Sequence, residues 1–442
     1  MLRRLGLLAH PFLFALWPVI TLYSFNNSQT LPSEMIVPGI VVTILTVLLL
    51  AAFAAIYGSW LRGGVVVAIF WLLLFSYSQV SLTIGGMYPQ YEAVHGPTLL
   101  LAVWGLILVL LVFSVGKWSV RPVTGLAAIL SVVGVALVAV PAARAVPSWA
   151  SAASMIPAGP ADVVATKKPA TLPDIYYIIL DGYARADVLA EMYGYDNSAF
   201  LDRLEQKGFF IAKNSRSNYP QTHLSLASSL NGVYLDSLAD VAGSDSGNRN
   251  YLKEMIKDNW VSTFLKSEGY TYVTYSSGYL DDELGAAELY KAPALSPNQF
   301  QNSLINFTPI AYLADLQYGW HRDRLLYNFE HLPDATKIDG PVFVVAHILA
   351  PHHPFVFGSS GEEIPHDRLF TFADDDFFTL HPELAALELD LAALVLHGAQ
   401  LEQELAPVDA RPARDREHLL AVSLRAAQAE DARHRRDHHR VA

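Results

Sequence analysis

The chain has 442 residues, enough for two or three domains, and its composition is 52% hydrophobic and only 16% charged. It has 42 Asp and Glu against 30 Lys and Arg, a net charge of −12. These values exclude a wholly soluble protein and a basic nucleic-acid binder, so we expect no nucleic-acid partner. The chain has no cysteine, which excludes disulfides, thiolate nucleophiles and cysteine-ligated zinc.

The apolar residues gather before residue 141, where Glu34 and Glu92 are the only acidic residues. Five runs there approach the roughly 20 residues that cross a bilayer as a helix. The predicted spans are approximately 5–22, 35–57, 65–80, 98–115 and 124–140. Buried helices of a large soluble protein are the alternative. Five successive runs with so little charge between them favour a membrane domain at 1–140, with the lipid bilayer as partner.

The positive charges of this part predict its orientation, because Lys and Arg concentrate in cytoplasmic loops. Arg3 and Arg4 precede the first span, and Arg62 lies between the second and third spans. Lys117 and Arg121 lie between the fourth and fifth spans. The loops 23–34 and 81–97 have neither Lys nor Arg. We therefore expect a multi-pass protein of the cell (inner or plasma) membrane, with a cytoplasmic N-terminus and everything after residue 140 outside the cytoplasm.

Residues 141–173 are rich in Ala, Pro and Ser and show no sustained period, which predicts a linker. The next stretch, 174–378, alternates buried strands with helices. The expected strands are 174–180, 270–275 and 341–349, and the expected helices are 198–207 and 251–267, closed by Gly208 and Gly269. Strands separated by helices predict an α/β domain with a mostly parallel sheet covered on both faces.

The first expected strand ends at Asp181, in the motif IILDGYARAD. Active sites of parallel sheets form at the carboxyl ends of the strands. A carboxylate on a rigid element is the oxygen ligand that a hard divalent cation needs. An Asp-Gly turn without a ligand is the alternative.

Thr222 precedes a small-residue helical segment in NYPQTHLSLASSLNG, at 218–232. A hydroxyl at a helix N-terminus is well placed to attack an anionic centre, because free N–H groups and the helix dipole stabilise the developing charge. A helix-capping threonine is the alternative. The competing hydroxyls of Ser225, Ser228 and Ser229 share a helix face, which favours a packing role.

Three histidines follow the last expected strand in HILAPHHPF: His347, His352 and His353. Imidazoles at such a position can ligate a metal or donate to a phosphoryl oxygen. A loop with incidental histidines is the alternative, although three within seven residues at a strand end are unusual.

In this order the three motifs resemble the membrane-anchored branch of the alkaline phosphatase/sulfatase superfamily, which includes lipoteichoic acid synthases and phosphoethanolamine transferases. The resemblance implies an alkaline-phosphatase-like α/β domain in which Asp181 and Thr222 bind one divalent metal ion, Mn, Zn, Ca or Mg. It also implies that Thr222 is the nucleophile and that His352, in the H-x-P-[FY] motif, contacts the transferred group. His347 and His353 become candidate substrate contacts. The C/S-x-P-x-R motif of formylglycine sulfatases is absent, which favours phosphoryl chemistry through threonine.

The sequence departs from this family after Phe378. The family's later Asp-His-Gly, which supplies two further metal ligands, is absent, and the tail at 379–442 has no aromatic residue where about seven would be expected. Its one Asp-His pair, Asp437-His438, lies in a charged run with no strand before it. Either the tail is a helical appendage, or a frameshift or early stop replaced the last third of the domain. The abrupt change of composition favours the second explanation.

The leading functional hypothesis is a membrane-bound, metal-dependent hydrolase or phosphotransferase. Its substrate would be a phosphorylated, less readily a sulfated, lipid head group or envelope polymer outside the cytoplasm. The missing Asp-His-Gly keeps open an alternative, a catalytically inactive membrane protein whose sulfatase-like domain binds a ligand.

Overall fold

The structure is a computed structural model, and it describes residues 7–87, 89–151, 171–243, 246–280, 284–285, 287–311, 316–357 and 361–364. The expected tail and the end of the expected α/β domain lie outside these residues. The chain forms two compact units. The membrane unit comprises Met1–Met155, Gly247–Asn250 and Gln299–Gln317, and the α/β unit comprises the rest.

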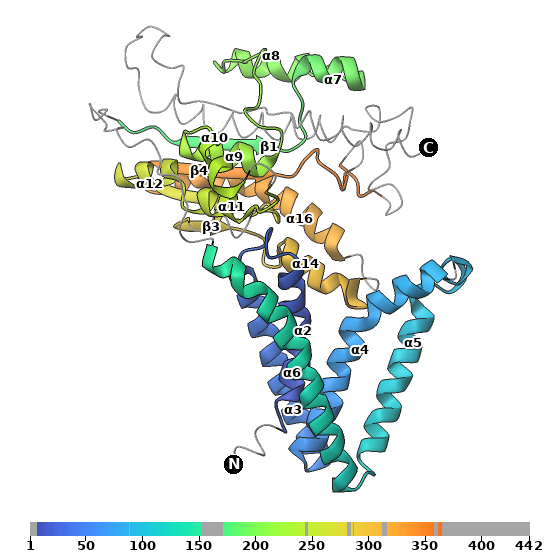
Figure 1. Cartoon of the computed structure of the whole chain (residues 1–442). Helices are drawn as coiled ribbons and strands as arrows, with labels where there is room; N and C mark the ends of the chain where they lie inside the picture. The colour runs from blue at the N-terminus through green and yellow to red at the C-terminus, as the bar shows by residue number, and fades with distance from the viewer. Residues whose placement is uncertain are drawn as a thin grey trace. The chain divides into compact units, whose positions relative to one another are not determined.

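Apolar helices build the membrane unit (Figure 1). They are α2 (His10–Phe25), α3 (Ile36–Tyr57), α4 (Trp60–Met87), α5 (Pro89–Val115) and α6 (Val120–Ser151), with the short 3-10 helix η1 (Pro32–Met35) before α3. Within the described residues, four apolar stretches reach membrane length: Pro32–Tyr57, Trp60–Met87, Thr98–Val115 and Val120–Ala145. Large apolar side chains of α3, α5 and α6 stay exposed, among them Leu48, Phe113 and Val132. Such surfaces suit lipid, so these helices indicate a multi-pass membrane protein.

The first predicted span is shorter than expected. Its helix α2 has 16 residues, about 24 Å, because it begins at His10, where Pro11 occupies the first turn. Helix α2 packs closely on α6. A Cβ added at Gly134 of α6 would lie 2.9 Å from the Cβ of Leu13 of α2. His10 approaches Gly64 near the start of α4, and Asn27, just after α2, donates to the carbonyl of Arg144 near the end of α6. The helix therefore extends along the bundle beside its longer neighbours.

The last predicted span is longer than expected. Helix α6 continues to Ser151, through the first part of the expected linker 141–173, because the alanines there favour helix. Residues 152–170 of that linker lie outside the described residues.

The α/β unit contains a four-stranded sheet in which every pair is parallel. Its strands are β1 (Ile175–Leu180), β2 (Thr271–Tyr275), β3 (Leu289–Lys291) and β4 (Val342–Ile348), in the order β1-β4-β2-β3. The central position of β4 places Ile179 beside His347, one residue from the end of each strand. This arrangement confirms the expected fold class, a multi-span helical domain followed by an α/β domain with a parallel sheet.

Helices cover both faces of the sheet. Alternate β4 residues, such as Val344 and Ala346, pack in one apolar cluster with Leu189 of α7 (Ala186–Tyr193), Phe200 of α8 (Ser198–Gln206) and Leu325 of α16 (Leu316–His331). Phe343 and Val345 face the other side. They pack with α9 (Thr222–Asn231), α10 (Asp236–Ala242), α11 (Asn250–Lys257) and α12 (Trp260–Ser267). The period of two along β4 thus separates two cores.

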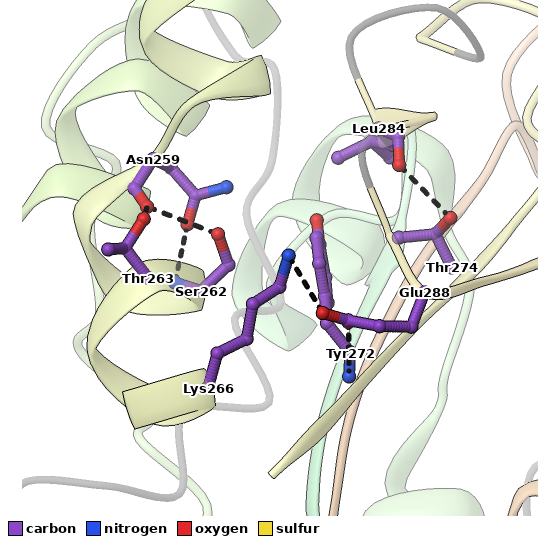
Figure 2. Close-up of polar contacts among 8 residues, drawn as sticks. All are labelled: Asn259, Ser262, Thr263, Lys266, Tyr272, Thr274, Leu284 and Glu288. Atoms are coloured by element: carbon purple, nitrogen blue, oxygen red, sulfur yellow. Dashed lines mark hydrogen bonds and ion pairs between the residues drawn. The ribbon is translucent and has the colours of Figure 1, made fainter. Parts of the chain in front are cut away.

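The single helix expected at 251–267 is two helices, α11 and α12. They separate at Asn259, whose side-chain oxygen accepts from the N–H of Ser262 at 2.8 Å and so begins α12 (Figure 2). Gly269 closes α12 as expected, with φ +100 and its N–H on the carbonyl of Lys266. Glu288 pairs with Lys266 at 3.1 Å and accepts from the N–H of Tyr272 at 3.0 Å, which ties α12 to the start of β2 (Figure 2).

Candidate active site at the carboxyl edge of the sheet

The ends of the neighbouring strands β1 and β4 bring two of the sequence motifs together. The N–H of Asp181 donates to the carbonyl of Ile348 at 2.9 Å, which continues the β1–β4 pairing beyond β1. Gly182 follows with φ +86, and a Cβ there would lie 3.2 Å from the backbone N of His352. The backbone of the histidine loop therefore rests on Gly182, a contact that a larger residue would obstruct.

His347 links the two strands through its side chain. It is 1% exposed, and its Nε2 lies 3.2 Å from Oδ2 of Asp181. Because a carboxylate only accepts, Nε2 carries the hydrogen of this bond. The Nδ1 atom of His347 is buried without a hydrogen-bond partner in the part of the chain that the structure describes.

The surroundings of Asp181 keep it ionised. Burial raises its pKa, but the hydrogen bond from His347, the charges of His347 and His352 and the N–H of Gly182 together outweigh burial. The net effect is a pKa below the ordinary value of 3.8. Asp181 is therefore an anion near neutral pH, with 13% of its side chain exposed.

Thr222 is the first residue of α9 and follows Gln221, which is extended. Its side chain is half-buried, and its hydroxyl makes no hydrogen bond within the described residues. Two contacts connect this helix end to the strand ends. Nδ1 of His223 lies 3.2 Å from the hydroxyl of Tyr279, whose ring centroid lies 6.3 Å from that of His347. Thr222 thus belongs to the helix end that His223 and Tyr279 connect to His347, while no hydrogen bond within the described part of the chain joins Thr222 to Asp181.

The competing serines of α9 are engaged elsewhere. The hydroxyl of Ser228 donates to the carbonyl of Val233 at 2.6 Å, and that of Ser229 donates to the carbonyl of Ser225 at 2.7 Å. The hydroxyl of Ser225 lies 3.4 Å from that of Ser217. These contacts agree with the packing role that the sequence indicated.

The two loop histidines stack on one another, with ring centroids 4.2 Å apart. Nδ1 of His352 donates to the carbonyl of His353 at 2.6 Å. His352 is half-buried, whereas His353 is exposed. Of the two, His352 is the one whose charge reaches Asp181.

Comparison with known protein families identifies this region. Residues 173–368 match the family described as Sulfatase. This stretch is a sulfatase-family domain. It contains β1 to β4 and every candidate residue named above. Searches of curated proteins and of solved structures gave no significant match.

The sulfatase-family domain contains further candidate residues that sequence reasoning missed. His223 and Tyr279 carry the contacts between α9 and His347, and His321 lies on α16. Burial, the charge of Arg324 and the proximity of His352 lower the pKa of His321 to about 3, so it is neutral near pH 7. His223 directly follows Thr222, within the sequence motif at 218–232, so the sequence could have indicated it. Tyr279 and His321 are far from every motif in the sequence, and only folding shows their positions.

Arg324 is also buried, at 3% exposure. It donates to the hydroxyl of Ser276 at 3.1 Å and to the carbonyl of Pro297 at 2.8 Å. Its guanidinium occupies the space beside Gly278 where a side chain would be, and Gly278 has φ +75. Arg324 therefore holds the turn that follows β2 in place.

Domains of the sulfatase family typically bind a metal, so the site can be tested for a complete ligand set. The anionic Asp181 and the hydroxyl of Thr222 suit a hard cation. Within the described residues, however, no three His, Asp or Glu side chains converge in a way that could hold an ion. These residues therefore fit one side of a metal site and do not complete it.

Proposed function

We propose that the protein is a membrane-bound hydrolase or phosphotransferase of the sulfatase family. Its substrate is a phosphorylated, in preference to a sulfated, lipid head group or envelope polymer outside the cytoplasm. The observation that carries the proposal is the meeting of the Asp181–Gly182 turn with the His352 loop at the carboxyl edge of the parallel sheet. Ligands of such sheets bind at this edge.

Thr222 is the nucleophile in this proposal. Its hydroxyl makes no hydrogen bond among the residues that the structure describes, and Thr222 opens α9, whose first N–H groups lack intrahelical partners and favour an anion. The Thr222 oxygen would bond to phosphorus while the bond to the leaving group breaks. The oxygen of water or of an acceptor hydroxyl would then bond to phosphorus while the bond to the Thr222 oxygen breaks. Attack by water is hydrolysis, and attack by an acceptor hydroxyl is transfer.

The other side chains position charge around that step. Asp181, held by His347, and Thr222 are the ligands that we assign to a divalent ion, which would supply neutralisation of phosphate charge. His352 is half-buried beside Asp181 and is the group that we assign to a phosphoryl oxygen. His347, fully buried, orients Asp181. The exposed position of His353 agrees less well with a substrate contact.

The arrangement of the membrane helices favours a substrate at the outer face of the membrane. The positively charged connections lie at one end of the bundle, where Nη2 of Arg62 donates to the carbonyl of Trp118 at 2.7 Å. The chain leaves α6 at the other end, since α6 begins at Val120 beside these charges. By the positive-inside rule, this arrangement supports a location of the sulfatase-family domain outside the cytoplasm.

A second function is supported by the incomplete metal site. With no Asp-His-Gly in the sequence and no three metal-binding side chains together in the described residues, the domain could bind a phosphorylated ligand without turning it over. This alternative keeps the fold and the membrane location and predicts binding without a phospho-enzyme.

Assays of the purified full chain separate the two functions. Phosphodiester and phosphomonoester turnover, and transfer from vesicles of phosphatidylethanolamine or phosphatidylglycerol, are measured with Mn²⁺, Zn²⁺, Ca²⁺ and Mg²⁺ in turn. We expect turnover with at least one ion and a phospho-adduct on Thr222. Binding of vesicles without turnover under every condition would favour the alternative.

The nucleophile has a matched control in the same helix. Thr222→Ala should lower kcat by at least about a thousandfold, as removal of a covalent nucleophile does. Ser229→Ala should change it little, because that hydroxyl is bound to a backbone carbonyl. Retention of most activity by Thr222→Ala, or an adduct on a serine, would overturn the assignment.

A further inference from the structure

Part of the later sequence packs with the membrane helices. Residues 299–311 lie between two stretches of the α/β unit but belong to the membrane unit. These residues include the helix α14 (Gln299–Asn306), labelled in Figure 1. It buries Phe300 and Leu304, which are four residues apart and share one face. This face packs in one apolar cluster with α2 residues Phe14, Val19 and Tyr23. The apolar side of α14 is thus covered by protein.

The end of α14 is hydrogen-bonded to α4. The hydroxyl of Ser78 donates to the carbonyl of Asn306, and the N–H of Ser78 donates to the carbonyl of Phe307 at 3.3 Å. Both donors of this transmembrane-helix residue thus face the carbonyls of the last residue of α14 and of the residue after it. Backbone groups near a bilayer need partners, since little water is available there. Each element therefore satisfies groups of the other.

A second segment docks on the connection between α2 and α3. The N–H of Arg249 donates to the carbonyl of Ser28 at 2.6 Å, and Nδ2 of Asn250 donates to the carbonyl of Asn27 at 2.6 Å. Asn250 is 2% exposed. The contacted connection carries no Lys or Arg, so it belongs to the end of the bundle that the charge rule places outside the cytoplasm.

We propose that residues 299–311, together with 247–250, form a docking element that attaches the α/β unit to the membrane helices independently of the covalent linker after α6. Its binding surface is the non-cytoplasmic end of α2, η1 and α4 of the same chain. The buried apolar face of α14 and its hydrogen bonds from Ser78 are the contacts expected of a helix that binds a protein surface. A lipid-binding helix would leave that face open. The proposal does not depend on the catalytic activity.

The absence of cysteine allows a direct test by cross-linking. A protease site is inserted within 152–170 of the full chain, and Ser78→Cys is combined with Phe307→Cys. After oxidation and cleavage, the two fragments should migrate as one species without reductant and as two with it. The control pair Ser114→Cys and Phe307→Cys, with Ser114 near the positively charged end of α5, should stay separable. Equal cross-linking of both pairs, or of neither, would overturn the proposal.

Co-purification tests the strength of the attachment. With a tag at the N-terminus, the cleaved protein is purified in detergent, where lipid contact alone does not hold the fragments together. We expect the later fragment to remain bound, and Leu304→Asp to release at least half of it. Ser303→Asp is the control, because its exposed hydroxyl donates to the carbonyl of Gln299 within α14 itself. Loss of the fragment without any substitution, or retention by Leu304→Asp equal to the control, would refute the docking element.

Discussion

The backbone N of His352 lies 3.2 Å from the place that a Cβ would take at Gly182. The Asp-Gly turn after β1 and the histidine loop after β4 are therefore packed backbone to backbone, although about 170 residues separate them in the sequence. Adjacent parallel strands make this possible, because their carboxyl ends meet at one edge.

Gly182→Ala should destabilise the fold and displace the loop. A side chain at φ +86 costs about 1–2 kcal/mol, and the approach of His352 adds about 1–3 kcal/mol. Gly208→Ala is the matched control, because φ is +89 there and nothing lies within 4 Å of the added Cβ. Thermal unfolding of both variants measures the difference. Equal losses of stability would show that the Gly182–His352 contact imposes no constraint.

The stability of the α/β unit should fall as the pH falls below about 6.5, through His321. Its pKa is about 3 in the folded state and 6.5 in the unfolded chain, so the unfolded chain binds the extra proton between these values. A depressed folded pKa gives stability that is complete above pH 6.5 and is lost by about 1.4 kcal/mol per pH unit below it. The groups that face His321 are Arg324 and His352.

His321→Gln should remove this slope, which melting temperatures measured from pH 4 to 7 would show. Asp181 contributes at lower pH, because its folded pKa lies below 3.8 and its contribution is lost only as the pH falls through that folded value. An unchanged slope between pH 4.5 and 6.5 in His321→Gln would contradict the role of His321.

Asn259→Ala should lower the stability of the α/β unit by about 1–2 kcal/mol. The variant loses the bond from the N–H of Ser262 at 2.8 Å (Figure 2). It also leaves the carbonyl of Ile256 without the donor that it has at 2.8 Å. Asn259 is fully buried, so water cannot replace these bonds. Ser267→Ala removes only an exposed hydroxyl of the same helix and should change stability by less than about 0.5 kcal/mol. Chemical denaturation measures both.

The sulfatase-family domain should lie outside the cytoplasm whether or not α2 crosses the bilayer. Its side is determined by α6, which starts beside Arg121 and ends away from it. An alkaline phosphatase reporter, active only outside the cytoplasm, should be active after residue 160 and inactive after residue 117. A third fusion after residue 27 reports on α2 itself and should be active if this helix spans. The opposite pattern at 160 and 117 would reverse the orientation.

Local pattern alone predicted the apolar helices, the strands β1, β2 and β4 and the end of α12 at Gly269. Each depends on the period or length of a short run or on one glycine conformation, which neighbouring residues determine. The break at Asn259 was missed because the apolar pattern runs through it. The capping bond of one asparagine decides between one helix and two.

The roles assigned to Asp181, Thr222 and His352 stay predictions. Their positions could be predicted from the sequence, because each of their motifs stands at a strand end or a helix start. The contacts of Tyr279 and His321 are not visible in the sequence, because the β1-β4-β2-β3 order brings together segments that no local period connects. The docking of α14 has the same cause. An amphipathic helix of eight residues does not specify which surface covers it, and only the tertiary structure, in which burial against α2 removes its apolar face from water, decides that question.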